Sequence, residues 1–153
     1  GTQGARYGTG LGIIAYGDTN GGQINVSNLI NTSGVVSADV SGVGSTSYGK
    51  ACAEYGGDKA FFAFGYSAGG SVINIKNLVS NSGTVAANAT GVGTARGFPT
   101  AVTLGSRQTA VIAYGTTGSN VSISNLVNSS GVVASDTTGV GTARKEMGST
   151  EFG

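Results

Sequence analysis

The sequence has no histidine and no tryptophan, and it has a single proline, Pro99, a single cysteine, Cys52, and a single methionine, Met147. Without histidine there is no imidazole to act as a general base or to complete the common zinc sites. One cysteine cannot close a disulfide within the chain. We therefore expect no enzyme, no cofactor and no metal site.

Charge and long apolar runs are also scarce. Lysine and arginine number 8 against 7 acidic residues among 153, a formal net charge of +1. No block of basic residues is present to neutralise a run of phosphates, so we expect no nucleic-acid partner. The longest apolar runs, such as residues 60–64, have about five residues where a membrane helix needs about 20, so we expect no membrane partner.

Glycine is abundant, at 29 of 153 residues, and the sequence repeats itself. The pair Asn-Leu begins at positions 28, 77 and 125, and Gly-Val-Gly begins at positions 42, 91 and 139. Ser-Gly follows the same spacing, at positions 33, 82 and 130. The chain is therefore three copies of a unit of about 49 residues, with no linker between them.

The middle copy predicts four short strands and no helix. Residues 50–55 carry small side chains, and residues 60–64 are apolar on both faces, as in a strand packed between two layers. Residues 73–76 alternate apolar and polar side chains, which indicates a half-buried strand. Residues 84–88 are short and polar, which suits an edge strand. The corresponding predicted strands elsewhere are residues 12–16, 100–104, 110–114 and 121–124.

Four strands in about 45–50 residues match one blade of a β-propeller, counted from its inner strand outwards. The sequence resembles that of kelch-like propellers. Residues 93–96 and 141–144, both Gly-Thr-Ala-Arg, are similar to the exit of a kelch blade, and residues 63–66 are similar to the end of its second strand. The resemblance implies an all-β propeller, a fold that hosts many functions.

The chain departs from the kelch pattern in three places. A single glycine replaces the double glycine, the blade tryptophan is absent, and Ser47 stands where the other copies have Arg96 and Arg144. The glycine-rich, tryptophan-free repeats are also similar to tandem propeller repeats of phage and environmental-virus proteins.

The number of repeats raises the question of ring closure, since known propellers have about 4–8 blades. We expect two chains to form a six-bladed homodimer. The first eight residues overlap the last eight in repeat phase. Within one repeat domain, residues 1–153, the blades would span about 9–56, 57–105 and 106–153, with strand 145–153 completing a shared blade. The alternative is a monomeric β-trefoil, and a β-solenoid or intertwined fibre is a further one.

Several motifs are interpreted as structure. Residues 65–69 fit the G-x-S-x-G nucleophile pattern but lack a histidine and a following helix. Residues 18–21 open like a calcium loop but lack its later ligands. Cys52 is expected to be a buried small residue. Arg96 and Arg144 are expected to hold backbone carbonyls at the blade exits.

The function expected is that of a non-enzymatic binding module, which recognises a surface glycan in a lectin-like manner or a protein. The proposed ligand-binding residues are Tyr66, Asp18, Asn20 and Asn120, in loops between second and third strands, which share one face of a propeller. An exposed tyrosine ring can stack on a sugar while Asp and Asn accept hydrogen bonds from its hydroxyls.

A structural role is the competing interpretation, because the equivalent loops 18–20, 66–68 and 116–118 differ in sequence. The protein would then be a component of a phage or virus particle, or a designed or excised propeller fragment without its own ligand. A virion-associated or extracellular location fits these interpretations.

Overall fold

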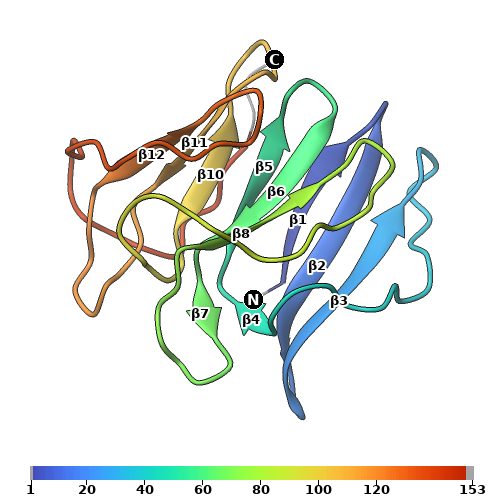
Figure 1. Ribbon diagram of the computed structural model, residues 1–153, viewed down its shortest axis with the longest axis horizontal. Helices are drawn as coiled ribbons and strands as arrows, with labels where there is room; N and C mark the ends of the chain where they lie inside the picture. The colour runs from blue at the N-terminus through green and yellow to red at the C-terminus, as the bar shows by residue number, and fades with distance from the viewer. Residues whose placement is uncertain (1, 151–153) are drawn as a thin grey trace.

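The computed structural model describes residues 2–150, and within this range the chain forms twelve strands in four antiparallel sheets and no helix (Figure 1). The prediction of an all-β fold is confirmed. None of the four sheets closes on itself. The strands are β1 (Gln3–Tyr7), β2 (Leu11–Thr19), β3 (Gly22–Ile30), β4 (Ser47–Tyr48), β5 (Ala51–Tyr55), β6 (Lys59–Ala63), β7 (Tyr66–Ser67), β8 (Ile75–Val79), β9 (Ala89–Thr90), β10 (Thr100–Thr103), β11 (Ala110–Ala113) and β12 (Ser124–Val127).

Each repeat contributes one main sheet. The first sheet has the order β1-β2-β3, the middle sheet β5-β6-β8-β9 and the third sheet β10-β11-β12, while β4 and β7 form a separate two-stranded pair. The fourth strand of each repeat is reduced to short pairings, which suits its polar sequence. Two short pairings of this segment recur. One is a bridge in each sheet, namely Ile30 to Val36, Val79 to Val85 and Val127 to Val133. The other is a bridge from Ser27 to Val40 and from Ser124 to Thr137, with the β8–β9 pair at the equivalent place in the middle sheet.

Strand pairing groups the chain differently from the sequence-based blade limits. The small-residue strand is the first strand of each sheet, since β5 pairs with β6 and β10 pairs with β11 along their lengths. The predicted blade limits instead place this strand at the end of the preceding blade. The main sheets with their bridges therefore cover residues 3–40, 51–90 and 100–137. Third strands also start later than predicted, at residues 75 and 124, because the chain leaves the sheet after the second strand.

A strained aromatic residue marks this departure in every repeat. Tyr16, Phe64 and Tyr114 have φ values of 60°, 59° and 61°, in the left-handed region that non-glycine residues rarely adopt. In the first sheet the residue sits in a β-bulge, where the register shifts between Ala15 and Gly17. Because bulges redirect side chains, the repeat uses this one to orient an aromatic ring.

The core lies between the sheets. One buried cluster joins the first and middle sheets and includes Ile13 and Phe62, while the other joins the middle and third sheets and includes Phe61 and Ile112. Phe61 and Phe62 are neighbours on β6, so they point to opposite faces of the middle sheet. This confirms the prediction of a strand packed on both faces. We call these two contacts the first interface and the second interface.

The small-residue strands lie side by side in the centre of the molecule. Figure 1 shows β5 between β1 and β10, and β5 contacts both of them. The three main sheets thus form an open row rather than a closed ring. The hairpin turns after the second strands, near residues 20, 69 and 118, all lie at the lower end of this view.

The C-terminal strand expected at residues 145–153 is not seen in the part of it that the structure describes. Residues 145–150 form no strand, and residues 151–153 lie outside the described range. β1 pairs with β2 from Gln3 to Tyr7 and so occupies the first-strand place of the first sheet. A shared blade would require the C-terminal segment to displace β1.

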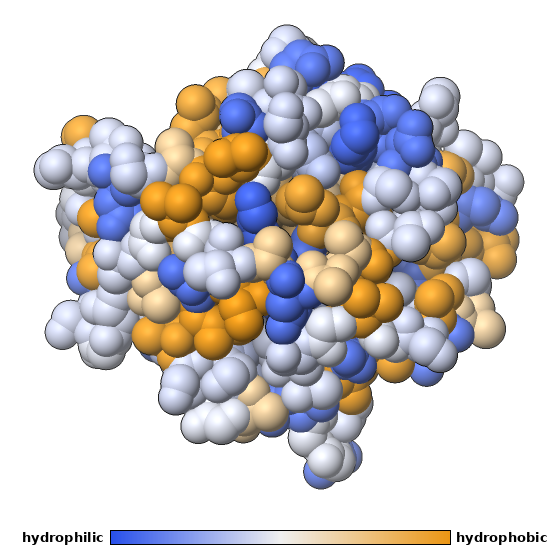
Figure 2. Space-filling model, viewed as in Figure 1, coloured by the Kyte–Doolittle hydropathy of each residue, from blue (hydrophilic) through white to orange (hydrophobic). Residues whose placement is uncertain are grey.

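Apolar residues reach the surface in several patches, which appear orange between hydrophilic side chains in Figure 2. Eight large apolar side chains are exposed among the described residues, all of them valine or leucine, and seven of the eight belong to the first and third repeats, at the two ends of the row. The exposed residues are Val35, Val36, Val40, Val92, Leu104, Leu126, Val132 and Val140.

Candidate binding surface

The four sequence-predicted binding residues lie in or beside the equivalent turns that follow the second strands, which lie at one end of the sheets (Figure 1). Asp18 lies near the end of β2 and Tyr66 begins β7, whereas Asn20 and Asn120 lie outside the strands. Asp18, Asn20 and Asn120 are exposed. Asp18 accepts a hydrogen bond from Gln23 Nε2 at 3.2 Å, which closes the turn between β2 and β3. These polar side chains therefore reach solvent at this end of the sheets.

Tyr66 differs from the prediction of an exposed ring, because it is half-buried. It stacks on Tyr48 with ring centres 5.3 Å apart and an interplanar angle of 17°. Phe98 lies 5.3 Å from Tyr66 and 6.1 Å from Tyr48, so the three rings form an aromatic cluster. Gly97 allows this packing, since a Cβ there would overlap the Tyr66 ring.

Tyr48 and Phe98 were missed from the sequence. Both come from the segments that connect one sheet to the next, and the equivalent positions in other repeats are not aromatic: Gly97 matches Tyr48, and Gly49 matches Phe98. A comparison of repeats therefore gives no signal for the cluster. Within residues 2–150, no hydrogen bond or ring contact joins Tyr66 to Asp18, Asn20 or Asn120.

A groove of about 390 Å³ lies beside the aromatic cluster and contains Phe98 in its wall. Lys145 places its ammonium 5.6 Å from the centre of the Phe98 ring and pairs with Glu146 at 3.4 Å. Gln3 contributes an amide to the lining. The groove thus combines one aromatic ring with hydrogen-bonding groups of several kinds.

A second groove of about 370 Å³ runs along the inner strands β1, β5 and β10. Its lining includes the buried Glu54, whose carboxylate lies 3.9 Å from Arg6 Nε. Thr103 from β10 donates to the backbone oxygen of Glu54 at 3.1 Å. Cys52 Sγ donates to the backbone oxygen of Gly4 at 2.7 Å, and burial raises the pKa of this thiol to about 12. Cys52 therefore stays in the thiol form at neutral pH, and the thiolate is the form that acts as a nucleophile.

The recurring aromatic residues hold cations at the sheet ends. The Arg96 guanidinium carbon lies 4.3 Å from the Phe64 ring centre, and Lys50 Nζ lies 4.7 Å from that of Tyr16. The rings therefore serve packing between sheets, in cation–π contacts.

Arg96 is fully buried and links the middle and third sheets. Its Nε donates to the Tyr114 backbone oxygen at 2.7 Å and its Nη1 to that of Thr94 at 3.2 Å. Nη2 donates to Asn125 Oδ1 at 2.8 Å. Burial lowers the pKa of Arg96 to about 10, which leaves the guanidinium charged at neutral pH. The prediction that Arg96 holds backbone carbonyls is confirmed.

Lys50 performs the same task at the first interface, which the sequence did not reveal. The position aligned with Arg96 is Ser47, but Lys50 three residues later donates from Nζ to Asn77 Oδ1 at 3.3 Å. It is almost fully buried, and burial lowers its pKa from 10.5 to about 8.

A recurring acid or amide completes each interface. Asp136 accepts from Asn125 Nδ2 at 2.9 Å and from Thr94 Oγ1, on the segment leaving the middle sheet, at 2.6 Å. Burial acts to raise the pKa of Asp136, but the hydrogen bonds from Thr94 and Asn125 and the charge of Arg96 together lower it. Asp136 therefore links its own sheet, through Asn125, to the segment that leaves the middle sheet, through Thr94.

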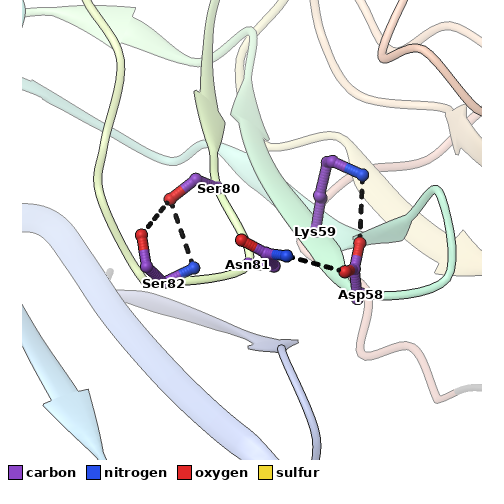
Figure 3. Close-up of polar contacts among 5 residues, drawn as sticks. All are labelled: Asp58, Lys59, Ser80, Asn81 and Ser82. Carbon is purple, nitrogen blue, oxygen red and sulfur yellow. Dashed lines mark hydrogen bonds and ion pairs between the residues drawn. The ribbon is translucent and has the colours of Figure 1, made fainter.

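The opposite end of the middle sheet carries a small polar cluster (Figure 3). Asp58 pairs with Lys59 at 3.0 Å and accepts a hydrogen bond from Asn81 Nδ2 at 3.0 Å. Ser80 accepts from the backbone N–H of Ser82 at 3.3 Å. In the other repeats an asparagine accepts the equivalent bonds, so these residues form turns of the kind that polar side chains stabilise.

The remaining motifs also form turns. In the G-x-S-x-G segment, Ser67 Oγ donates to the backbone oxygen of Ser71 at 3.2 Å and closes the loop after β7. In the segment that opens like a calcium loop, Thr19 Oγ1 donates to the Gly22 backbone oxygen at 2.9 Å. Among residues 2–150, no three His, Cys, Asp or Glu side chains group closely enough to hold a metal ion.

Comparison with known proteins gives no family for this chain. No protein-family model matches it, and no curated protein is similar to it. Within the described residues, no helix has the length and apolar character needed to cross a membrane.

Proposed function

We propose that the protein is a non-enzymatic binding module built on a six-bladed, kelch-like propeller of two chains, and that its ligand is a surface glycan. The observation that carries the ligand proposal is the aromatic cluster of Tyr48, Tyr66 and Phe98, which borders a polar groove at the end of the sheets. Aromatic rings beside hydrogen-bonding groups suit a ligand with apolar faces and many hydroxyls.

The propeller proposal is supported by the way the sheets follow one another. Three sheets of the same strand order succeed each other along the chain, with β1, β5 and β10 adjacent in the centre. This face-to-face packing with the first strands innermost supports the proposal, because the blades of a propeller are arranged in the same way. Three such blades leave the row open, and two chains would supply six.

The turns add further polar groups to the same face. Asp18 and Asn20 of the first sheet and Asn120 of the third sheet are exposed there. In a ring of two chains every such group would occur twice, which gives avidity for a surface that displays many copies of a ligand.

A structural role has one observation in its favour. The residues that recur in every repeat, such as Tyr16, Phe64 and Tyr114, serve the packing between sheets, whereas the exposed turns differ. Such a chain would be a rigid part of a larger particle, without a ligand of its own.

A glycan array probed with the intact protein tests the proposal. We expect binding that is lost in Tyr66→Ala and largely kept in Tyr66→Phe, because phenylalanine preserves the stacking on Tyr48. Val92→Ala, at an exposed position away from the cluster, is the matched control. If no glycan binds while the assembly stays intact, the structural role is the correct one.

A further inference from the structure

The two outward faces of the row have the residues of an interface but no sheet against them. On the first sheet, Ile14 and Ile30 are half-buried and Val36 is 53% exposed. Their equivalents in the middle sheet, Phe62, Val79 and Val85, all belong to the buried cluster of the first interface or pack against it. We call this surface of the first sheet the acceptor face.

The third sheet has the complementary surface. Val111 lies next to the buried Ile112 on β11 and points to the opposite side, and Leu126, on that same outer side, is 45% exposed. The equivalent of Leu126 is Leu78, which packs into the second interface. We call this surface, together with the connecting segment that ends at Arg144, the donor face.

Arg144 on the donor face already has the arrangement of Arg96. Its guanidinium carbon lies 4.3 Å from the Tyr114 ring, and its Nη1 donates to the Thr142 backbone oxygen at 3.1 Å. Arg96 is 0% exposed because the third sheet covers it, whereas Arg144 is exposed. Within residues 2–150, no amide plays for Arg144 the part that Asn125 plays for Arg96.

The acceptor face contains that missing amide. Asn28 donates from Nδ2 to Asp39 Oδ1 at 2.8 Å and to the Ser37 backbone oxygen at 3.1 Å. Asn125 makes the same two bonds, to Asp136 and Ala134, each at 2.9 Å. The Oδ1 of Asn125 is then directed to Arg96. Asn28 is therefore prepared to accept a hydrogen bond from a cation that this copy of the chain does not supply.

A contact between a glycine and a leucine of the preceding sheet occurs at both interfaces, and its two halves are unpaired on the acceptor and donor faces. A Cβ on Gly131 would lie 2.9 Å from Leu78, and one on Gly83 would lie 2.9 Å from Leu29, because a leucine of the preceding sheet fills each place. At the equivalent Gly34 on the acceptor face, nothing lies within 4 Å. Leu126 on the donor face is the leucine without such a glycine.

We propose that the acceptor face of a second copy of this chain docks on the donor face and repeats the second interface. Arg144 donates to Oδ1 of the partner's Asn28, Thr142 donates to the partner's Asp39, and Leu126 fills the space over the partner's Gly34. The four polar residues are the same types as Thr94, Arg96, Asn125 and Asp136 of the second interface. Because the residue types and their places in the repeat match those of the second interface, the partner that fits these faces is another copy of this chain.

The contact is head-to-tail, since each copy uses a different face toward each neighbour. The number of copies in the assembly rests on the proposed function, in which two chains of three sheets each form a ring of six blades. The connecting segment already follows the repeat as far as residue 146: Gly49, Phe98 and Glu146 have φ values of 60°, 49° and 59°. Docking replaces one contact, the hydrogen bond from Arg144 Nε to Met147 Sδ.

Two exposed substitutions test the contact. Leu126→Asp disables the donor face and Val36→Asp the acceptor face, and neither side chain belongs to the core of its own chain. Light scattering over a dilution series should show a dimer for the unaltered protein. We expect each variant alone to be monomeric, with the dissociation constant raised at least 100-fold. Val92→Asp, on a valine that is also 53% exposed, is the control and should stay dimeric.

Mixing the two variants distinguishes head-to-tail docking from a symmetric contact. Each variant keeps the face that the other has lost, so a 1:1 mixture should form a heterodimer through one intact contact. A monomeric unaltered protein, a dimer that survives Leu126→Asp, or a mixture that stays monomeric would overturn the proposal, provided that circular dichroism shows both variants folded. Arg144→Ala should weaken the dimer about tenfold or more, and Arg144→Lys, which keeps the charge but loses the planar set of donors, should weaken it less.

If the proposed function is wrong, the experiments give results that differ from those expected if the contact is wrong. An assembly of more than two copies that is broken by both variants and restored by mixing would contradict the two-chain ring and support the contact. Absence of glycan binding by an intact dimer would contradict the ligand and leave the contact unaffected.

Discussion

The first and second interfaces solve one packing problem with different chemistry. At the first, Lys50 reaches Asn77 through a single bond of 3.3 Å, and the capping residue is the neutral Asn88. At the second, Arg96 makes four hydrogen bonds, and the capping residue is the charged Asp136. The place thus requires a cation over an aromatic ring and an amide that accepts from it, while the charge of the cap is free to vary.

The difference matters because the two cations respond differently to burial. A lysine can lose its proton, and burial lowers the pKa of Lys50 to about 8. An arginine stays charged and depends on its planar set of donors, and all three guanidinium nitrogens of Arg96 donate hydrogen bonds. The second interface should therefore be the more sensitive to loss of a polar partner.

Removal of the accepting amide gives the largest expected effect. Asn125→Ala leaves the fully buried Arg96 without its side-chain partner, so it should lower the free energy of unfolding by about 3–5 kcal/mol. Asn77→Ala, the matched change at the first interface, should cost about 1–3 kcal/mol, because Lys50 can become neutral. Urea unfolding measures both. Equal losses would show that the two cations do not differ as argued.

The pH dependence of stability sharpens the same comparison. Burial lowers the pKa of Lys50 from 10.5 to about 8, so between these pH values the unfolded chain binds more protons than the folded chain. The free energy of unfolding should therefore rise with pH in this window, by on the order of 1 kcal/mol relative to Lys50→Arg. Thermal melts at pH 7.5 and 9.5 measure the difference. The ionisation of Cys52 and of tyrosines occurs in both proteins and cancels.

The smallest effect is expected from the C-terminal segment. Removal of residues 147–153 keeps Arg144 and Glu146 and leaves β1 paired with β2, so the dimer should keep its dissociation constant within about twofold. Sedimentation of the shortened protein is the measurement. Dissociation would instead show that residues 145–153 complete a shared blade, as the sequence predicted.

The repeat made much of the fold predictable. The spacing of Asn-Leu and Gly-Val-Gly predicted three repeated units, found as three main sheets of three, four and three strands, and the apolar stretch at 60–64 predicted a strand packed on both sides, found as β6 at Lys59–Ala63. A residue that recurs in all three repeats supports the same structural prediction three times. The start of the third strands was misplaced, because the left-handed backbone conformation of Phe64 depends on packing of its ring under Arg96 rather than on local propensity.

The candidate site was predicted less well, because it consists of residues that do not repeat. Tyr66 was singled out as an unrepeated aromatic residue, but its partners Tyr48 and Phe98 come from connecting segments with no aromatic equivalent. Lys50 was missed for a related reason, since it reaches its place from three residues beyond the aligned Ser47. Long side chains can replace one another from different positions, and alignment by residue number does not detect this.

The position of Phe61 and Phe62 on the two sides of β6 has a consequence for how the molecule unfolds. The middle sheet is common to both buried clusters, whereas each outer sheet belongs to one. In a linear array with nearest-neighbour coupling, the end units open first and the central unit last. Amide hydrogen exchange should therefore be slowest in β6 and faster in β3 and β12. Docking of a second copy would remove the ends of the array and slow exchange in the outer sheets as well.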